Sequence, residues 1–319
     1  MNILFITSTR IGDAVLSTSL LDHVIRMHPG ARLTVACGPA AAPLFEAVPG
    51  LSRVIIMRKR RAALHWLDLW RQTVPTVWSL VVDVRASAIA WLLLADERRV
   101  FKPRPAERVH RMVQLARMFD LRVPPSPHLW SAPSHEIAAA GLIPAGPVLA
   151  IGPTANWRGK TWRAERFAAL VQRLTGRDGI LPNAPVAVFG GPNEREAARP
   201  VLEAIPAARR IDLVGHAELL TAYACLKRCA FYVGNDSGLM HIAAAAGIPT
   251  LGLFGPSRVE NYAPWGDKTA YVSTATPYDE LFAPGFDHRT TDTLMDSLTL
   301  EAVVAAAEDL WRRVGAHRS

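Results

Sequence analysis

The sequence contains few cysteines, which narrows the kinds of site and compartment that suit it. Three occur among 319 residues, and Cys225 and Cys229 stand one helical turn apart with no further metal ligands near them in the sequence. A structural zinc site needs more ligands than this, so none is expected. We expect all three to be free, buried thiols of a protein kept in a reducing compartment.

A long hydrophobic run is also missing. The run AIAWLLLA falls far short of the roughly 20 apolar residues that a membrane-spanning helix requires. The opening MNILFITSTR places no basic segment before its short apolar run, which is not typical of a secretory signal peptide. We expect a cytoplasmic protein, with any membrane contact peripheral and on the inner face of the cytoplasmic membrane.

Acidic residues are scarce in the first half only. Residues 1–145 hold 18 Lys and Arg against 10 Asp and Glu, whereas residues 146–319 hold 18 of each, so the first half carries the whole net charge of +8. This asymmetry suggests an anionic partner, which could be nucleic acid, a membrane surface or an acidic or phosphorylated sugar. A basic surface that is merely solvated is the alternative.

Short β-branched runs alternate with amphipathic helical patterns along the chain. NILFIT, RLTVAC, RVIIM and SLVVDVR are predicted strands, and helical periodicity occurs at residues 12–30 and around 62–73 and 107–119. Such alternation is the signature of a doubly wound parallel sheet.

Prolines crowd residues 121–147, where regular structure is not expected to continue. The strand and helix alternation restarts after them and ends in an amphipathic helix over SLTLEAVVAAAEDLWRRV, capped by Thr299. The chain is also longer than one hydrophobic core usually serves. We therefore predict an α/β protein with two Rossmann-like domains, residues 1–145 with the interdomain linker and residues 146–319.

The stretch GNDSGLMHIAAAAGIPTLGLFGPS, residues 234–257, places polar groups at the end of a predicted strand. Asp236 and Ser237 are good N-cap residues for the helix that follows, and Gly238 would let a phosphate approach its N-terminus closely. Asp236 would repel that phosphate, so we expect it to face sugar hydroxyls, with His241 near the same end. A simple N-cap with a satisfied histidine is the alternative.

Four more polar residues follow other predicted strands. Asp13 comes after the first strand, and Thr154 and Lys160 come after the first strand of the second domain. The lysine could neutralise a diphosphate. Glu194, after the next strand, could accept hydrogen bonds from ribose hydroxyls. Their alternatives are an ordinary helix cap, a solvent-exposed lysine and a first-turn glutamate favoured by the helix dipole.

Taken in order, these motifs resemble glycosyltransferase family 9, the ADP-heptose:lipopolysaccharide heptosyltransferases. The resemblance covers nearly the whole chain through RIGDAVLSTSLL, KTWRAERFAAL, GNDSGLMHIAAAAGIPTLGLFGPS and MDSLTLEAVVAAAEDL, and NDSGLMHIAAA is its most specific part. It implies a GT-B architecture, two Rossmann-like domains facing each other across a cleft. The first domain would bind the acceptor and the second the nucleotide-sugar donor.

The resemblance also implies a role for each matching residue. Asp13 matches the family's proposed catalytic base, and Lys160 matches the lysine near the donor phosphates, where it would also assist catalysis. Glu194 matches the ribose contact and Asp236 the sugar-binding aspartate. The implied donor-binding set is Thr154, Lys160, Glu194, Asp236, Ser237, Gly238 and His241.

The implied reaction is an inverting transfer of heptose from ADP-heptose. Asp13 would take the proton of an acceptor hydroxyl as it attacks the anomeric carbon. Lys160 and the helix N-terminus at Ser237 would stabilise the departing diphosphate. The sequence contains no Asp-x-Asp pair, and this lysine and helix could supply the charge neutralisation that Mg²⁺ supplies elsewhere. No metal or other cofactor is expected to be essential.

The family's acceptor is the anionic inner core of lipopolysaccharide, Kdo-lipid A, and two basic segments of the first half could bind it. The first segment, MRKRRAALHWLDLW, contains Arg58, Lys59, Arg60 and Arg61. The second segment, DERRVFKPRPAERVHR, includes Arg98, Arg99, Lys102 and Arg111. The predicted acceptor contacts are Arg58, Lys59, Arg60, Arg61, Arg104 and Arg108. General surface charge is the alternative, or attraction to anionic lipid, to which each basic residue contributes about 1 kcal/mol. We expect Trp66 and Trp70 to lie in the core rather than to face lipid.

Two other functions remain open at this point. A nucleotide-sugar epimerase of GT-B architecture would form product without an acceptor, and a non-catalytic nucleotide-sugar-binding protein would not turn over at all. The presence of both Asp13 and Lys160 counts against the latter. No nucleic-acid recognition motif occurs in the basic half, so no nucleic-acid partner is expected.

Overall fold

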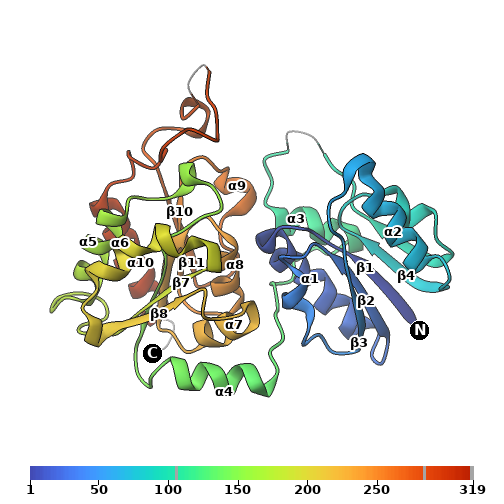
Figure 1. Cartoon of the computed structure of the whole chain (residues 1–319), viewed down its shortest axis with the longest axis horizontal. Helices are drawn as coiled ribbons and strands as arrows, with labels where there is room; N and C mark the ends of the chain where they lie inside the picture. Colours follow the sequence, from blue (N-terminus) through green and yellow to red (C-terminus); the bar gives the residue numbers. More distant parts are fainter. Residues whose placement is uncertain (105–106, 283–284, 317–319) are drawn as a thin grey trace. The chain divides into compact units, whose positions relative to one another are not determined.

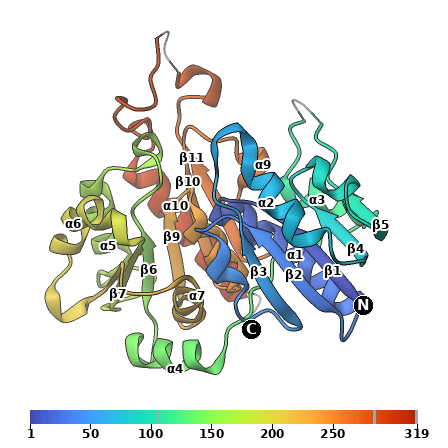
Figure 2. The same ribbon diagram turned by 45° about the vertical axis from the view of Figure 1, so that its right-hand side comes forward.

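The chain folds into two compact units, each built on one parallel β-sheet. The computed structural model describes residues 1–104, 107–282 and 285–316. Contacts divide it into unit 1, Met1–Ala132, and unit 2, Pro133–Ser319. Helices flank both faces of each sheet (Figure 1 and Figure 2). The predicted pair of doubly wound, Rossmann-like α/β domains is confirmed.

Unit 1 has a five-stranded sheet in the order β3-β2-β1-β4-β5. Its strands are β1 (Asn2–Ile6), β2 (Arg32–Cys37), β3 (Leu51–Ile56), β4 (Trp78–Asp83) and β5 (Ala95–Val100). Its α-helices are α1 (Ile11–Met27), α2 (Leu64–Thr73) and α3 (Arg111–Ala116). Ile3 of β1 pairs with both Leu33 of β2 and Leu80 of β4, so the chain changes direction across the sheet at β1.

The two faces of β1 are both buried, as its continuous apolar run predicts. Leu4 and Ile6 belong to a hydrophobic core that also contains Leu69 of α2 and Trp78 of β4, and we name it the α2 core. Side chains alternate along a strand, so Ile3 and Phe5, which are equally buried, face the other side of the sheet. Trp66 and Trp70 pack against the α2 core, as expected.

Unit 2 has a six-stranded sheet in the order β11-β10-β9-β6-β7-β8. Its strands are β6 (Leu149–Gly152), β7 (Val186–Gly190), β8 (Arg210–Val214), β9 (Phe231–Asn235), β10 (Thr250–Phe254) and β11 (Thr269–Ser273). Its α-helices are α4 (Pro133–Leu142), α5 (Ala164–Thr175), α6 (Arg195–Ala204), α7 (Leu219–Lys227), α8 (Gly238–Ala245), α9 (Val259–Tyr262) and α10 (Leu300–Ala316). The Thr299 hydroxyl accepts the Ala302 N–H at 3.2 Å, which confirms the predicted cap of α10.

Helix α4 corrects the expectation that residues 121–147 lack regular structure. It starts at Pro133, and proline is tolerated in the first turn because its missing N–H would have no helical partner there. The helix packs against α7, with Glu136 and Lys227 paired at 2.7 Å. The two units consequently meet in sequence between Ala132 and Pro133, whereas the sequence placed the boundary between residues 145 and 146.

Two edge strands, β5 and β11, escaped the sequence prediction. Strand β5 reads ADERRV, in which charges replace the usual apolar run. An edge strand has one neighbour only, and it is the place where proteins tolerate charged side chains in a sheet. Strand β11 reads TAYVS and pairs with β10 at the opposite edge of the other sheet.

The three cysteines are free and buried, as predicted. Within the described ranges, no helix is long and apolar enough to cross a bilayer.

Candidate active site

The carboxyl ends of β6 and β9 form the switch point of the unit 2 sheet. The two strands are neighbours, but the chain continues from β6 toward β7 and from β9 toward β10, on opposite sides. Gly152, the last residue of β6, pairs with Gly234 of β9. Open α/β sheets bind their ligands at this kind of position, so the polar residues that follow the two strands form the candidate site.

Two glycines make room for a buried tyrosine at this edge. A Cβ atom on Gly152 or on Gly234 would overlap the Tyr232 hydroxyl. Burial raises the pKa of Tyr232, and the neighbouring Ser237 hydroxyl offsets part of the rise. The phenol is therefore a neutral, fixed part of the strand ends on which the site stands.

Lys160 and Asp236 form an ion pair at the switch point. Their Nζ and Oδ2 atoms lie 2.6 Å apart, although 76 residues separate them in sequence. Only 9% of the Asp236 side chain and 25% of the Lys160 side chain are exposed. The lysine follows β6 and the aspartate follows β9, so the pair joins the two loops predicted to hold the donor. It also balances the charge of a carboxylate that would otherwise repel a phosphate.

Asn235, the residue before Asp236, also links the loops that follow β6 and β9. Its Nδ2 donates to the carbonyl of Pro153 at 2.8 Å. Its Oδ1 accepts the N–H of Trp162 at 3.1 Å. The side chain is fully buried, so both of its polar ends are satisfied inside the protein. Asn235 was not among the predicted site residues, and its place between Gly234 and Asp236 was the only sequence signal for it.

Thr154 and Glu194 also meet at this edge. The Thr154 hydroxyl donates to Glu194 Oε2 at 2.8 Å, and the N–H of Gly191 donates to the same oxygen at 2.7 Å. Glu194 ends a short 3₁₀ helix after β7, the strand next to β6. Both bonds hold one carboxylate oxygen, which leaves Oε1 outside this arrangement.

Helix α8 begins directly after the Lys160–Asp236 pair. Ser237 occupies the N-cap position with extended backbone, φ −148° and ψ 172°, but its side chain makes no capping hydrogen bond. The N–H groups of the first turn, from Gly238 onward, therefore have no side-chain acceptor from the cap residue, and they carry the partial positive charge of the helix N-terminus. His241 lies one turn later and is 4% exposed.

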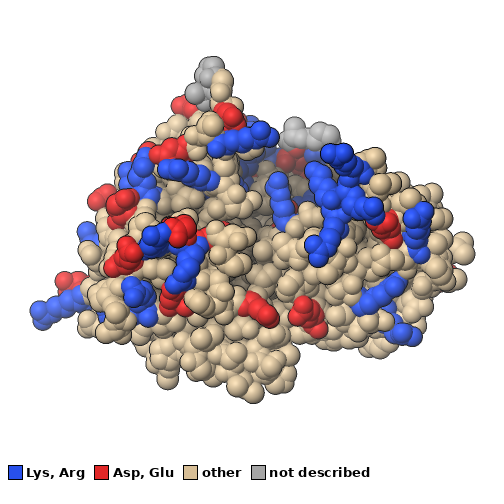
Figure 3. All heavy atoms as spheres, viewed as in Figure 1, with Lys and Arg blue, Asp and Glu red and all other residues tan. Residues whose placement is uncertain are grey.

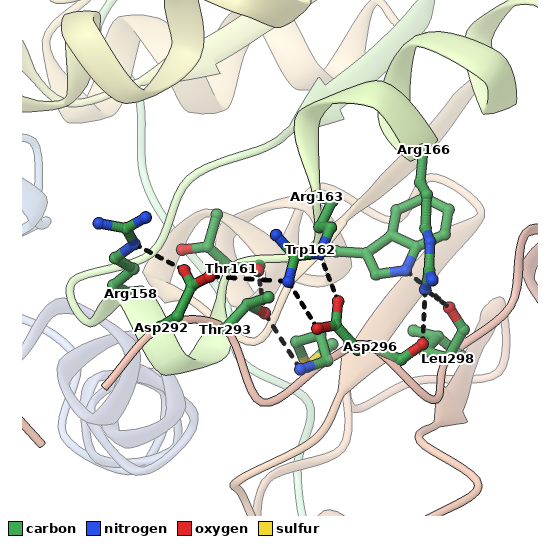
Figure 4. A network of polar contacts seen from close by, with 10 residues as sticks. Arg158, Thr161, Trp162, Arg163, Arg166, Asp292, Thr293, Asp296 and Leu298 are labelled. Atoms are coloured by element: carbon green, nitrogen blue, oxygen red, sulfur yellow. Dashed lines mark hydrogen bonds and ion pairs between the residues drawn. The ribbon is translucent and has the colours of Figure 1, made fainter. Parts of the chain in front are cut away.

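A C-terminal segment holds the loop that carries Lys160 (Figure 4). We name residues 288–298 the clasp. Arg163 donates to both carboxylate oxygens of Asp296 at 2.5 and 2.6 Å. Arg158 pairs with Asp292 at 2.9 Å. Further bonds run from Thr293 Oγ1 to the carbonyl of Thr161 and from Trp162 Nε1 to the carbonyl of Leu298.

The charges of the clasp shift the acidity of its carboxyls. The hydrogen bond from Arg163 lowers the pKa of Asp296. The N–H of Thr293, followed by the charges of Arg158 and Arg163, lowers the pKa of Asp292. Both carboxylates remain ionised at neutral pH and keep their arginine partners. Sequence reasoning missed the clasp because over 120 residues separate the two segments.

In unit 1 the switch point lies between β1 and β4. Asp13 is in the first turn of α1, just after β1, and is half-buried with no hydrogen-bond or ion-pair partner among the described residues. Asp83 ends β4 and is fully buried. It accepts hydrogen bonds from Arg85 N, Ser87 N and Ser87 Oγ. Burial nevertheless raises its pKa. The sequence analysis did not single out Asp83, although an acid closing the strand SLVVD was a signal.

The predicted acceptor contacts of the first basic segment are exposed. Arg60 pairs with Asp68 at 2.7 Å, while Arg58, Lys59 and Arg61 have no ion-pair partner among the residues described. Figure 3 shows Lys and Arg gathering over the part of unit 1 that contains α2. A pocket of about 520 Å³ lies here, and its lining includes Arg58, Arg60, His65, Arg71, Ile55 and Met57.

Several arginines of the second basic segment make contacts within the protein. Arg98 donates to the carbonyls of Ala90, Leu93 and Ala95. Arg99 pairs with Glu97, and Arg111 stacks on the ring of Phe101. Arg104 and Arg108 are exposed, and Arg104 lies 3.9 Å from Glu107.

The structure thus brings Thr154, Lys160, Glu194, Asp236, Ser237, Gly238 and His241 together in unit 2. Asp13 and the six residues predicted to bind the acceptor belong to unit 1.

Comparison with known proteins gives a consistent result. Residues 75–282, well over half of the chain, match the model of glycosyltransferase family 9 (heptosyltransferase). The lipooligosaccharide heptosyltransferase 2 of Haemophilus influenzae is 25% identical over 313 residues, which cover 85% of this chain and 88% of that protein.

Solved structures share the fold. The glycosyl transferase family 9 protein of Veillonella parvula superposes with a TM-score of 0.79 at 20% identity, over 98% of this chain and 97% of its own. The ADP-heptose heptosyltransferase II of Escherichia coli gives a TM-score of 0.73 at 22% identity, over 99% of this chain and 100% of its own.

Proposed function

The chain belongs to glycosyltransferase family 9, the heptosyltransferase family, and we propose from this premise that it moves a heptose from ADP-heptose to an anionic lipopolysaccharide core acceptor. The relatives support this donor and this class of acceptor, because one is a lipooligosaccharide heptosyltransferase and another an ADP-heptose heptosyltransferase. The acceptor would be Kdo-lipid A core or a similar glycolipid, reached by a cytoplasmic protein at the inner face of the cytoplasmic membrane.

The observation that carries the proposal is the Lys160–Asp236 pair beside the N-terminus of α8. A diphosphate placed there would meet the lysine ammonium and the N–H groups of Gly238 and its successors. With its charge balanced by Lys160, Asp236 can accept hydrogen bonds from sugar hydroxyls close to the phosphates. Glu194 Oε1, which neither Thr154 nor Gly191 uses, is available to the ribose hydroxyls.

Asp13 would act as the general base. Its carboxylate has no hydrogen-bond or ion-pair partner among the described residues, so its oxygens are available to accept a proton. It takes the proton of the acceptor hydroxyl while that oxygen forms a bond to the anomeric carbon from the side opposite ADP. The bond to the ADP oxygen breaks with its electron pair, and the configuration inverts. Lys160 and α8 stabilise the charge that collects on the leaving diphosphate, which is greater in the transition state than before it.

We propose that this chemistry requires no metal. A divalent cation would have to neutralise the diphosphate where Lys160 and the α8 N-terminus already supply positive charge. Addition of a chelator should therefore leave turnover unchanged. The basic residues of unit 1, Arg58, Lys59, Arg60, Arg61, Arg104 and Arg108, would bind the carboxylates and phosphates of the acceptor.

Calorimetric titration with ADP, UDP and GDP tests the donor half of the proposal. We expect selective ADP binding, weakened about ten- to hundredfold in Lys160→Ala because an ionic contact to phosphate is lost. Asp13→Ala should bind ADP like the wild type and lose transfer to an acceptor. A preference for UDP or GDP would overturn the donor, and product formed without an acceptor would favour an epimerase.

Asp236→Asn separates the two roles of the ion pair. The change removes the partner that holds Lys160 but keeps the shape of the side chain. ADP, which has no sugar, should bind as tightly as to the wild type or more tightly. Heptose transfer should fall by about a hundredfold, because the sugar contact is weakened. Unchanged heptose transfer in this variant would contradict a sugar-binding role for Asp236, and a loss of ADP affinity would show that Asp236 is needed to position Lys160.

A further inference from the structure

Arg85 differs from the other partly buried arginines of unit 1 in how its guanidinium is used. Arg98 donates to backbone carbonyls, Arg99 to a carboxylate and Arg111 to the side-chain oxygen of a glutamine. The Arg85 side chain makes no hydrogen bond or ion pair within the described ranges, and its Nη1 atom is shielded from solvent. Buried polar groups nearly always have such partners. The protein therefore holds a cation whose donors it does not use itself.

Arg85 lies at the carboxyl edge of the unit 1 sheet, beside the switch point. Asp83, the last residue of β4, pairs with Ile6, the last residue of β1. The N–H of Val84 donates to the carbonyl of Ile6 at 2.9 Å. The two strands are parallel, so the loop that leads to Asp13 and the loop that carries Arg85 leave the same edge of the sheet. An acceptor that reaches Asp13 would bind at this edge.

Asp83 fixes the loop that carries Arg85. Its Oδ1 accepts the N–H of Arg85 at 2.8 Å, and its Oδ2 accepts the N–H and the hydroxyl of Ser87 at 2.8 and 2.5 Å. Between them, Ala86 takes a left-handed conformation with φ +54°, which a residue with a Cβ atom rarely adopts. Backbone strain of this kind persists only where the surrounding structure imposes it. The end of β4 thus holds Arg85 in a defined position.

Trp66 supports the Arg85 guanidinium from helix α2. The Cζ atom of Arg85 lies 5.1 Å from the centre of the indole ring, within the range of a cation–π contact. Next to Trp66, His65 has a buried Nδ1 atom without a hydrogen-bond partner in the described chain, and it lines the pocket that also contains Arg58. The Arg85 side chain is only partly buried, so its remaining donors are open to a ligand.

We propose that Arg85 binds a carboxylate of the acceptor sugar and thereby selects acid sugars over neutral ones. A guanidinium presents its N–H groups in a plane that matches the two oxygens of a carboxylate. Asp83, the acid beside it, cannot take this place because both of its oxygens are engaged by the loop. A phosphate ester carries a further oxygen and more charge than one guanidinium matches. This inference rests on the proposed function, because it assigns one further residue of the acceptor site.

Binding of a carboxylated sugar in the absence of any donor tests the inference. The probes are the methyl glycoside of Kdo and the methyl ester of that glycoside, which lacks the negative charge. Ligand-observed NMR titration of the full wild-type chain should show the acid binding about tenfold or more tightly than the ester. In Arg85→Gln the acid should bind as weakly as the ester, whose affinity should stay at the wild-type value. Arg85→Lys should keep only part of the preference, because an ammonium lacks the planar fork.

Arg32→Gln is the matched control. Arg32 is exposed at the start of β2, at the opposite edge of the same sheet, so this variant should keep the full preference for the acid. An absent preference in the wild type, or one that survives in Arg85→Gln, would overturn the inference. An equal loss of acid and ester binding in Arg85→Gln would also overturn it, because Arg85 would then only support the fold around Trp66.

Two further outcomes separate the ligand and the donor from this inference. Glucose 6-phosphate that binds more tightly than the acid, and loses this affinity in Arg85→Gln, would overturn the choice of a carboxylate. The titration contains no nucleotide, so its result does not depend on the donor. A failed ADP titration together with an Arg85-dependent preference for the acid would overturn the proposed donor and support the acid-sugar site.

Discussion

Tyr232 and its two glycines define, at the residue scale, how tightly the strand ends of the site are packed. A methyl group on Gly152 would collide first with the Tyr232 hydroxyl and next with the ring carbon that bears it, at 3.1 Å. A methyl group on Gly234 would also meet the carbonyl oxygen of Gly152 at 2.7 Å, a backbone atom that cannot move aside. The two glycines are therefore required for different reasons.

We predict that Gly152→Ala destabilises the protein by about 1–3 kcal/mol, the usual cost of overpacking. Tyr232→Phe should recover most of the loss, because it removes the atom that collides first. Gly234→Ala should cost at least as much and should not be recovered by Tyr232→Phe. Chemical denaturation of Gly152→Ala and Gly234→Ala, each alone and combined with Tyr232→Phe, measures these differences. Equal recovery in both backgrounds would show that the backbone contact does not matter.

The residues of the donor site were predictable because each follows a strand with a clear apolar pattern. NDSG after AFYVG and Lys160 after VLAIG could be placed at one sheet edge from strand order alone. The Lys160–Asp236 bond itself could not, because it depends on the loop conformation that Asn235 and the clasp impose. Asp83 and Asn235 were missed since a buried polar residue at a strand end resembles any other strand residue in a single sequence.

At the scale of elements, the sequence predicted helices and strands correctly where their apolar residues form a regular pattern. Helix α5, Ala164–Thr175, can be read from the sequence, since its apolar stripe has a clear helical period. Strand β5 was missed because Asp, Glu and Arg fill its centre. Helix α4 was missed because prolines around it were given too much weight, although Pro133 starts the helix.

The clasp should stabilise the protein in a pH-dependent way. Asp296 has a lowered pKa in the folded state, so its contribution is fully present above the ordinary pKa of 3.8 and is lost as the pH falls through the lower value. Asp296→Asn should reduce the thermal midpoint by on the order of 2 °C at pH 7, the modest effect of a half-exposed ion pair. At pH 3, which is below 3.8, the difference from the wild type should be smaller than at pH 7, because part of the contribution of the Asp296 charge is then lost.

Asp309→Asn is the control for this experiment. Asp309 also contacts arginines, Arg312 at 3.5 Å and Arg313 at 3.3 Å, but within one exposed helix rather than across the clasp. It should leave the thermal midpoint unchanged at both pH values. A difference between Asp296→Asn and the wild type that persists unchanged at pH 3 would show that the clasp does not depend on the Asp296 charge.

At the scale of the whole molecule, each unit has a core of its own. The unit 2 core draws only on residues from Leu149 onward, and the α2 core of unit 1 only on residues up to Val100. Helix α4 joins unit 2 through Ala139 and through the Glu136–Lys227 pair, and Ile143, the residue after the helix, is fully buried like Ala139. A domain boundary read from proline content alone would separate this helix from the unit it stabilises.

We predict that a fragment of residues 133–319 folds and binds ADP, because the donor residues all lie within it. A fragment of residues 146–319, which follows the sequence-based boundary, should be less stable by about 2–4 kcal/mol since it exposes the surface that Ile143 and Ala139 cover. Urea denaturation of the two fragments compares them. Equal midpoints would show that α4 contributes nothing to unit 2.

The buried cysteines have a practical consequence for labelling chemistry. Burial raises the pKa of Cys37 and of Cys229 to about 12 and that of Cys225 to about 11. A maleimide reacts with the thiolate, and these side chains offer it neither that form at neutral pH nor access. Toward such a reagent the folded protein behaves as if it had no cysteine. A single surface cysteine introduced by mutation would therefore carry one dye, without removal of any native thiol.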